Sequence, residues 1–291
     1  MLTVEERMEM TKGILYLVPT PIGNLGDMTF RAVDILKSVD LILAEDTRHT
    51  LKLLNHFEIT TKQLSFHEHN TQSRLPEIMA LLNEGQSIAQ VSDAGTPSIS
   101  DPGYELVALA SKESIKIVPL PGANAGITAL IASGLTPQPF LFYGFLERKK
   151  QNRMAELENL KNHSEAVILY ESPYRIKKLL SELAEVYGEA QPICIARELT
   201  KTYEEFIRGT VCEVLERTKD KVWKGELVVI VGPHEVVDLT SGEEDYSHLT
   251  VLEHVDLVIS QDNLTSKEAI KKVAKLRQLP KQVVYRAYHE Q

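Results

Sequence analysis

The chain has 291 residues, 43% hydrophobic and 25% charged, a composition typical of a folded protein with one or two domains. Its net charge of −9 argues against a protein that coats DNA or RNA through a broad basic surface. No apolar run is long enough to span a bilayer and the first residues do not resemble a signal peptide, so we expect a cytoplasmic protein without membrane contact. Cys194 and Cys212 both lie in apolar runs and are expected to be core thiols.

Strands and helices are expected to alternate over the first 135 residues. Apolar runs predict strands at 14–18, 41–44, 64–67, 88–91 and 115–120. Apolar residues at helical spacing predict helices that start near Thr29 and Tyr104, and others over 74–82 and 127–133. Such alternation predicts a mostly parallel sheet with helices on both faces, so that the loops after the strands share one edge.

Polar loops follow four of these strands, at 19–27, 45–49, 92–103 and 121–125. The loop at 92–103 is the most informative, because two Gly and two Pro stiffen its backbone while Ser, Thr and Asp supply hydrogen-bonding groups. Open α/β sheets bind ligands at this edge, and the pattern therefore predicts a small-ligand site; the alternative is a long turn. For 45–49 the alternative is a helix cap at Asp46 or Thr47 beside a surface ion pair.

The second half is predicted to hold three further regions. Pro137 and Pro139 mark a boundary between an N-terminal α/β domain (13–135) and a C-terminal α/β domain (140–233), which has strands at 140–146, 166–170, 193–196 and 226–231 and an amphipathic helix over 175–187. Residues 234–263 are expected to be an acidic linker region, because seven acids and no Lys or Arg occur between Glu235 and Asp256. Residues 264–291 are predicted to form a basic appendage of two short helices, like a helix-turn-helix, capped at Thr265 or Ser266.

Several common sites are not indicated. The chain lacks the glycine-rich signatures of dinucleotide and P-loop nucleotide sites and the G-x-S-x-G of α/β-hydrolases. His67 and His69 with Glu68 form the one tight histidine group, without a zinc-type helix, so no metal site is expected.

Four segments in order resemble the tetrapyrrole methylase superfamily, and within it the branch of small-subunit ribosomal RNA methyltransferases I. They are L-Y-L-V-P-T-P-I-G-N-L-G-D from Leu15, A-E-D-T-R from Ala44, V-S-D-A-G-T-P-S-I-S-D-P-G from Val91 and P-L-P-G-A-N-A from Pro119. The resemblance extends from about Gly13 to His289. It implies two α/β domains with S-adenosylmethionine (AdoMet) in the cleft between them, a homodimer, and 2′-O-methylation of a cytidine in the decoding region of 16S ribosomal RNA within the 30S subunit.

The resemblance also implies cofactor contacts, which by position fall on Pro21, Asp93, Ala94, Gly95, Ser98, Asn124, Ala125, Glu171 and Leu199. Many members that act on small molecules read Gly-Gly-Asp where this chain has Asp93-Ala94-Gly95, so the carboxylate stands elsewhere. AdoMet has a sulfonium cation, an adenine face and an amino-acid end, and it therefore suits an apolar slot with backbone polar groups and few fixed cations.

A ribose hydroxyl is a poor nucleophile and benefits from a nearby base, for which Glu45, Asp46 and His49 are the candidates. Contacts to RNA are expected at Arg48, Arg148, Lys149, Lys150, Lys271, Lys272, Lys275 and Arg277. One alternative is a methylase of the same superfamily acting on a tetrapyrrole, which would have no use for the basic clusters. Another is a non-catalytic RNA-binding or assembly factor, and the tail could also be a helical cap that packs on the core.

Overall fold

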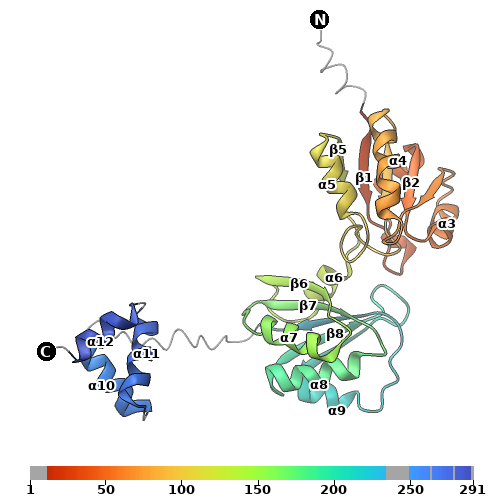
Figure 1. Ribbon diagram of the computed structural model, residues 1–291. Helices are drawn as coiled ribbons and strands as arrows, with labels where there is room; N and C mark the ends of the chain where they lie inside the picture. The colour runs from red at the N-terminus through yellow and green to blue at the C-terminus, as the bar shows by residue number, and fades with distance from the viewer. Residues whose placement is uncertain (1–11, 234–248, 263, 278, 290–291) are drawn as a thin grey trace, which may run out of the picture. The chain divides into compact units, whose positions relative to one another are not determined.

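The computed structural model describes residues 12–233, 249–262, 264–277 and 279–289 (Figure 1). The chain divides into two compact units, Met1–Glu235 and Val236–Gln291. The first unit contains two five-stranded sheets. Sheet one consists of β1 (Ile14–Val18), β2 (Leu41–Ala44), β3 (Gln63–Ser65), β4 (Ile88–Val91) and β5 (Lys116–Pro119) in the order β3-β2-β4-β1-β5. All its strand pairs are parallel, so the carboxyl ends of the strands meet at one edge as predicted.

Helices cover both faces of sheet one. On one face α2 (Phe30–Ser38) and α3 (Thr47–His56) bury Leu36 and Leu54, and on the other α4 (Thr71–Asn83) and α5 (Tyr104–Lys112) bury Ile78 and Leu106. Side chains of successive strand residues pack into the hydrophobic cores on opposite faces of the sheet. Because side chains alternate along a strand and both faces are covered, the strands read as continuous apolar runs, which is why the sequence predicts them well.

Sheet two consists of β6 (Phe140–Phe145), β7 (Ala166–Glu171), β8 (Pro192–Arg197), β9 (Glu205–Thr210) and β10 (Leu227–Val231) in the order β6-β7-β10-β8-β9. Its pairs are antiparallel except for β6 with β7. Three elements here were not predicted: β9, α7 (Lys150–Leu160) and α9 (Val211–Arg217). Strand β9 lies at the sheet edge and α7 is mostly polar, so neither has the apolar pattern that marks a buried element.

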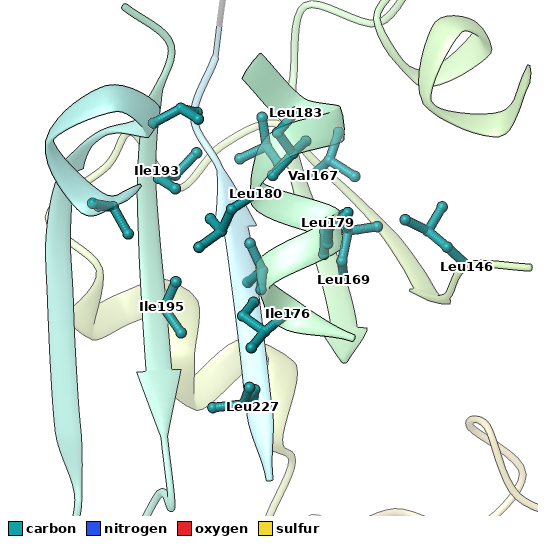
Figure 2. Close-up of a cluster of buried hydrophobic side chains, with 14 of the residues drawn as sticks. Leu146, Val167, Leu169, Ile176, Leu179, Leu180, Leu183, Ile193, Ile195 and Leu227 are labelled. Carbon is teal, nitrogen blue, oxygen red and sulfur yellow. The ribbon is translucent and has the colours of Figure 1, made fainter. Parts of the chain in front are cut away.

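The core on one side of sheet two is built around α8 (Ile176–Tyr187), the amphipathic helix that the sequence predicts. Leu179, Leu180 and Leu183 lie against strand residues that include Val167 and Ile193 (Figure 2). Helices α7 and α9 add Leu157, Leu160, Val211 and Val214 to the same cluster. This face is therefore closed by side chains and leaves the opposite face for contact with the first half of the chain.

Helix α6 (Ala125–Ala132) covers that opposite face. Ala129 and Leu130 of α6 share a core with Ile168 and Ile230 of sheet two. The Gly126 N–H donates to the hydroxyl of Tyr170 at 3.1 Å. Helix α6 comes before Pro137 and Pro139 in the chain, but it packs against sheet two. It therefore joins the two halves of the first unit.

The second unit is a cluster of helices, α10 (Val251–Asp262), α11 (Ser266–Leu276) and α12 (Lys281–His289). The structure differs from the expected acidic linker over 234–263, because α10 occupies much of that range and buries Val255 and Val258 against α11. Residues 234–248 of the expected linker lie outside the described residues. The acidic composition concealed the helical spacing of these valines. The helical appendage therefore has three described helices where the sequence indicated two.

Local chemistry defines two of these helix starts. Thr265 and Glu268 exchange bonds at the start of α11, where the Thr265 N–H and hydroxyl both donate to the Glu268 carboxylate. Thr250 and Glu253 do the same at α10.

Of the two cysteines, Cys194 is buried as predicted, but the prediction for Cys212 is wrong, because this residue is exposed in the first turn of α9. In the part of the chain that the structure describes, no helix is long and apolar enough to cross a membrane.

Candidate cofactor and substrate site

Three loops at the carboxyl edge of sheet one are tied together by hydrogen bonds. Thr20, after β1, exchanges two backbone bonds of 2.9 Å with Gly95, after β4. The Ser92 hydroxyl donates to the Gly95 carbonyl at 2.7 Å, and the Thr96 hydroxyl donates to the Ala123 carbonyl, after β5, at 3.0 Å. The loops are therefore held together by hydrogen bonds among their own backbone groups and hydroxyls, which fixes the shape of the edge before any ligand binds.

Gly95 lies where two of these loops approach each other closely. Its φ is +83°, a conformation that favours glycine, and a Cβ there would lie 3.2 Å from Ile22 Cγ2 and 3.5 Å from the Ala123 oxygen.

A cavity of about 450 Å³ opens beside these loops, a size typical of small-molecule sites. Both halves of the first unit contribute to its walls, with Glu45, Asp93, Asp101 and Asn124 from one half and Phe145, Tyr170, Glu171, Leu199, Glu226 and Val228 from the other. The lining combines apolar surface with five carboxylates, and none of the described residues that line it is Lys, Arg or His. Such a cavity suits a ligand with a positive group and a flat apolar part.

Two of the carboxyl groups have a raised pKa. Burial, followed by the neighbouring charges of Glu45 and Asp93, raises the pKa of Asp101 to about 7. The pKa of Glu45 is also raised, first by burial and then by Asp93. Asp93 itself is held in place, because its Oδ1 accepts the Asp46 N–H at 3.1 Å.

Glu171 is one of the lining residues, and its fully buried side chain supplies an acceptor in the cavity wall. Its Oε1 accepts from Arg175 Nε and from the Ser172 N–H, both at 2.7 Å. Its Oε2 is buried and finds no hydrogen-bond partner among the described residues. Because an unpaired buried acceptor is costly, this oxygen marks a position where a ligand donor would be stabilised.

The other base candidates lie elsewhere. Asp46 caps α3 and pairs with Arg48 at 3.0 Å, and the hydrogen bond from Arg48 lowers the pKa of Asp46 to about 2. His49 lines a neighbouring cavity of about 290 Å³ together with Pro21. Glu45 is thus the one of the three candidates that lines the larger cavity.

Comparison with known proteins agrees with this fold. The sequence pattern of the family described as Tetrapyrrole (Corrin/Porphyrin) Methylases matches residues 14–215. The chain belongs to the tetrapyrrole methylase family. It is similar to a protein of Bacillus subtilis (strain 168) named Ribosomal RNA small subunit methyltransferase I, with 53% identity over 95% of this chain and 94% of that protein.

Solved structures of tetrapyrrole methylases share the fold. Cobalt precorrin-4 methyltransferase, a cobalamin biosynthetic enzyme, is 17% identical with a TM-score of 0.58, covering 80% of this chain and 98% of that one. Uroporphyrin-III C-methyl transferase from Thermus thermophilus, complexed with S-adenyl homocysteine, is 19% identical with a TM-score of 0.52, covering 77% and 99%.

Within this tetrapyrrole methylase, most positions expected to contact the cofactor come together. Asp93, Ala94, Gly95, Asn124, Ala125, Glu171 and Leu199 all line the larger cavity. Pro21 lines the neighbouring one, and Ser98 lines neither. Ser98 instead adopts a φ of +67° in the loop, and a Cβ on Gly103 would lie 2.5 Å from its hydroxyl oxygen, which places it against the backbone.

The residues expected to contact RNA have three different settings. Arg148, Lys149, Lys150 and Lys271 are exposed, and so is Arg48, although Asp46 neutralises its charge. Arg277 is bound within the second unit, where it donates to His254 Nδ1 at 2.9 Å and to the Leu249 carbonyl at 2.8 Å. Lys272 is exposed but has interactions of its own, and the side chain of Lys275 lies outside the described residues.

Sequence reasoning missed several lining residues. Asp101 was recognised only as part of the loop 92–103, and its place in the lining beside Glu45 depends on the path of that loop. Phe145, Tyr170 and the 225–228 segment come from sheet two, whose packing against the first half has no local signal.

Proposed function

We propose that this chain methylates the 2′-hydroxyl of a cytidine ribose in the decoding region of 16S ribosomal RNA, within the 30S subunit of the cytoplasmic ribosome. The observation that carries the proposal is the acidic and apolar cavity, with its unpaired Glu171 oxygen, in a chain 53% identical to a protein named Ribosomal RNA small subunit methyltransferase I. The 2′-O position and the cytidine rest on the resemblance of the four sequence segments.

The cofactor is AdoMet, which supplies an electrophilic methyl group on a positively charged sulfur. The cavity fits it on three counts: carboxylates suit the positive groups, Leu199 and Val228 suit the adenine face, and the free Glu171 oxygen suits an ammonium or hydroxyl donor. We assign Asp93, Ala94, Gly95, Asn124, Ala125, Glu171 and Leu199 to its binding, with Pro21 at the neighbouring cavity.

The basic segment Arg148–Lys150 supports an RNA substrate. It begins α7, where the positive end of the helix dipole makes cationic side chains unfavourable. All three side chains are exposed, and the segment follows Phe145, which lines the cavity. Cations kept at an unfavourable position near the site are well placed to receive RNA phosphates.

Methyl transfer from labelled AdoMet tests the function directly. Small subunits that lack the modification should take up label in their RNA, and mapping of the ribose methyl should place it on one cytidine of the decoding region. Uptake into a tetrapyrrole instead would establish the small-molecule alternative. AdoMet binding without transfer to either substrate would leave the assembly-factor alternative in force.

We also propose that the chain acts as a homodimer. The local support is apolar surface around β6 and α6, where Phe140 is 39% and Ile131 74% exposed. Sedimentation at micromolar concentration should give twice the mass of one chain. An active monomer would contradict the proposal.

The exposed cations of the second unit should contribute to subunit binding but not to AdoMet binding. Lys267, Lys271, Lys281 and Arg286 are all exposed, whereas the apolar face of α11 is buried in the unit's own core. Changing all four to Gln should weaken binding to small subunits and reduce its dependence on salt, because each lost phosphate contact lowers the slope by about one. AdoMet affinity should stay unchanged in calorimetry.

The comparison must leave the helices intact. Because α10 shares its core with α11 and α12, a deletion from Asp262 would unravel that core, and the fourfold substitution is the cleaner test. If small-subunit binding by the fourfold variant depended on salt as it does in wild type, these four cations would not contact RNA phosphates.

A further inference from the structure

The smaller cavity of about 290 Å³ adjoins the larger one. The two share part of their lining, namely Ile22, Asp93, Ala94 and Glu226. The volume of the smaller cavity is at the lower end of the range for small-molecule sites, which suits one unit of a longer polymer better than a second large ligand. A group bound there lies next to a ligand in the larger cavity. The smaller cavity is therefore placed where a methyl acceptor would meet AdoMet.

The two cavities differ in charge. The described lining of the larger cavity contains no Lys, Arg or His, whereas Lys52, Lys201 and His49 line the smaller one. The ammonium group of Lys201 is already paired, because its Nζ lies 2.9 Å from Glu198 Oε1 and 3.0 Å from Glu226 Oε2. Lys52 is exposed, and its side chain has no hydrogen bond or ion pair with the residues that the structure describes. The smaller cavity therefore offers a positive charge to an anionic ligand, which the larger cavity does not.

Lys52 belongs to a face of α3 that carries no acidic residue. The helix, Thr47–His56, contains neither Asp nor Glu. His49, Lys52 and His56 are spaced by three and four residues, so they share one face of the helix, and all three are exposed. His49 and Lys52 line the smaller cavity, and His56 lies about one turn further along the helix. An anionic chain with one unit in the cavity can continue along this face without meeting a carboxylate of α3.

A buried hydroxyl and an apolar surface complete the smaller cavity. Thr50 is 2% exposed and lines the cavity, and its Oγ1 finds no hydrogen-bond partner among the described residues. Because an unpaired buried hydroxyl is costly, a ligand oxygen that bonds to it would be stabilised. Ile22 and Leu25 supply the apolar surface, and Leu25 is 43% exposed. These are the groups that a ribonucleotide requires, since it carries an anionic phosphate, sugar hydroxyls and a base with an apolar face.

We propose that the smaller cavity holds the target ribonucleotide of an unpaired RNA segment, with Lys52 at its phosphate and Thr50 at one of its oxygens; the inference rests on the proposed methyl transfer to RNA. The ribose then lies beside the shared lining, next to the cofactor in the larger cavity. Proteins recognise unpaired nucleotides in this way because a base inside a duplex is stacked and cannot enter a cavity.

Steady-state methyl transfer to unmodified small subunits tests the role of Lys52. Lys52→Gln should raise KM for the subunits about 10-fold and change kcat by less than about twofold, because a phosphate that does not react is bound equally before and during the transfer. Lys52→Arg keeps the charge and should stay within about threefold of wild type. AdoMet affinity in calorimetry should be unchanged in both variants, since Lys52 does not line the larger cavity.

Lys37→Gln is the matched control. Lys37 is an exposed cation in the last turn of α2, which covers the same face of sheet one as α3, and it lines neither cavity. This variant should have the KM of wild type. Lys52→Gln should also reduce the salt dependence of subunit binding by about 0.7, the change in slope for one phosphate contact to a single strand, whereas Lys37→Gln should not.

Thr50→Val separates a ligand contact from a structural role. Valine has nearly the shape of threonine and removes an unpaired buried hydroxyl, so the Tm should equal or exceed that of wild type. KM for the subunits should nevertheless rise several-fold. A lower Tm with unchanged KM would show that this hydroxyl serves the fold and would remove Thr50 from the proposed site.

The reactivity of lysines toward an acylating reagent gives a readout that is independent of turnover. The full chain is labelled with S-adenosylhomocysteine present, which has no methyl group to transfer, and the products are identified by mass spectrometry. Unmodified small subunits should protect Lys52, whereas Lys37 should react as it does in the free protein. Full reactivity of Lys52 at saturating subunits would overturn the proposed site.

The two possible failures differ in these measurements. If the wild-type chain transfers no methyl group to ribosomal RNA and the subunits leave Lys52 reactive, the proposed function is wrong and the nucleotide site with it. If wild type is active while Lys52→Gln keeps the wild-type KM and Lys52 stays reactive in the complex, the proposed function stands and the nucleotide site alone is overturned.

Discussion

Gly95→Asp is expected to lower AdoMet affinity by about 100-fold or more, a loss of about 3 kcal/mol in binding free energy. The new Cβ would lie 3.2 Å from Ile22 Cγ2 and 3.5 Å from the Ala123 oxygen, so the side chain would crowd the cavity wall. Its carboxylate would stand near a carbonyl oxygen, which offers no donor, in a cavity already lined by carboxylates. Calorimetric titration with AdoMet measures the affinity.

Gly188→Asp is the matched control. Gly188 has a φ of +92°, close to the +83° of Gly95, but a Cβ there would have nothing within 4 Å. Both variants should lose about 1–2 kcal/mol of folding free energy from the unfavourable backbone conformation, whereas Gly188→Asp should bind AdoMet normally. A folded Gly95→Asp protein with wild-type affinity would show that the cofactor lies elsewhere.

The first sheet could be predicted from sequence because its physics is local. The run Leu41–Ala44 is apolar throughout, since both faces of β2 are covered, and the expected strand has the bounds of the observed one. The polar loops after β2 and β4 share an edge through the parallel direction alone. The part of the cavity wall that comes from the loops of sheet one could therefore be predicted from the sequence.

The part of the cavity wall that comes from sheet two could not be predicted from the sequence. Tyr170 and Val228 line the cavity because α6 packs against sheet two. Packing between segments that are distant in the chain leaves no periodic pattern in the sequence of either segment. The raised pKa of Asp101 depends likewise on burial, which residue types alone do not reveal. The resemblance implies a cofactor contact at Glu171, but its unpaired buried oxygen is visible only in three dimensions.

Charge was the least reliable guide, as Arg153 shows. This arginine lies close in sequence to Arg148–Lys150 and carries the same charge, but its side chain is only 7% exposed. Its Nε and Nη2 bond both oxygens of Glu182 on α8 at 2.7 Å, and its Nη1 donates to the carbonyls of Glu147 and Arg148. Arg153 therefore fixes the backbone of the basic segment through these carbonyls, while the side chains of Arg148, Lys149 and Lys150 are exposed to solvent.

Arg153→Ala should consequently lower the free energy of unfolding by about 3–5 kcal/mol, because it leaves the Glu182 carboxylate buried without its partner. In thermal denaturation this corresponds to a fall of roughly 6 to 20 °C in Tm for a unit of this size. Arg153→Lys keeps the charge but cannot make the two-point contact, and should fall between the alanine variant and wild type. Lys149→Ala, which removes an exposed cation four residues away, should change stability by less than about 0.5 kcal/mol.

The double variant Arg153→Met with Glu182→Leu separates the two costs. Replacing both charges with apolar side chains of similar size removes the buried ions together, so most of the stability lost in Arg153→Ala should return. The triple variant of Arg148, Lys149 and Lys150 to Gln should show the opposite profile, with normal stability and weaker small-subunit binding. If Arg153→Ala were as stable as wild type yet lost subunit binding, Arg153 would belong with the RNA-facing cations after all, and its bond to Glu182 would have to open to reach the substrate.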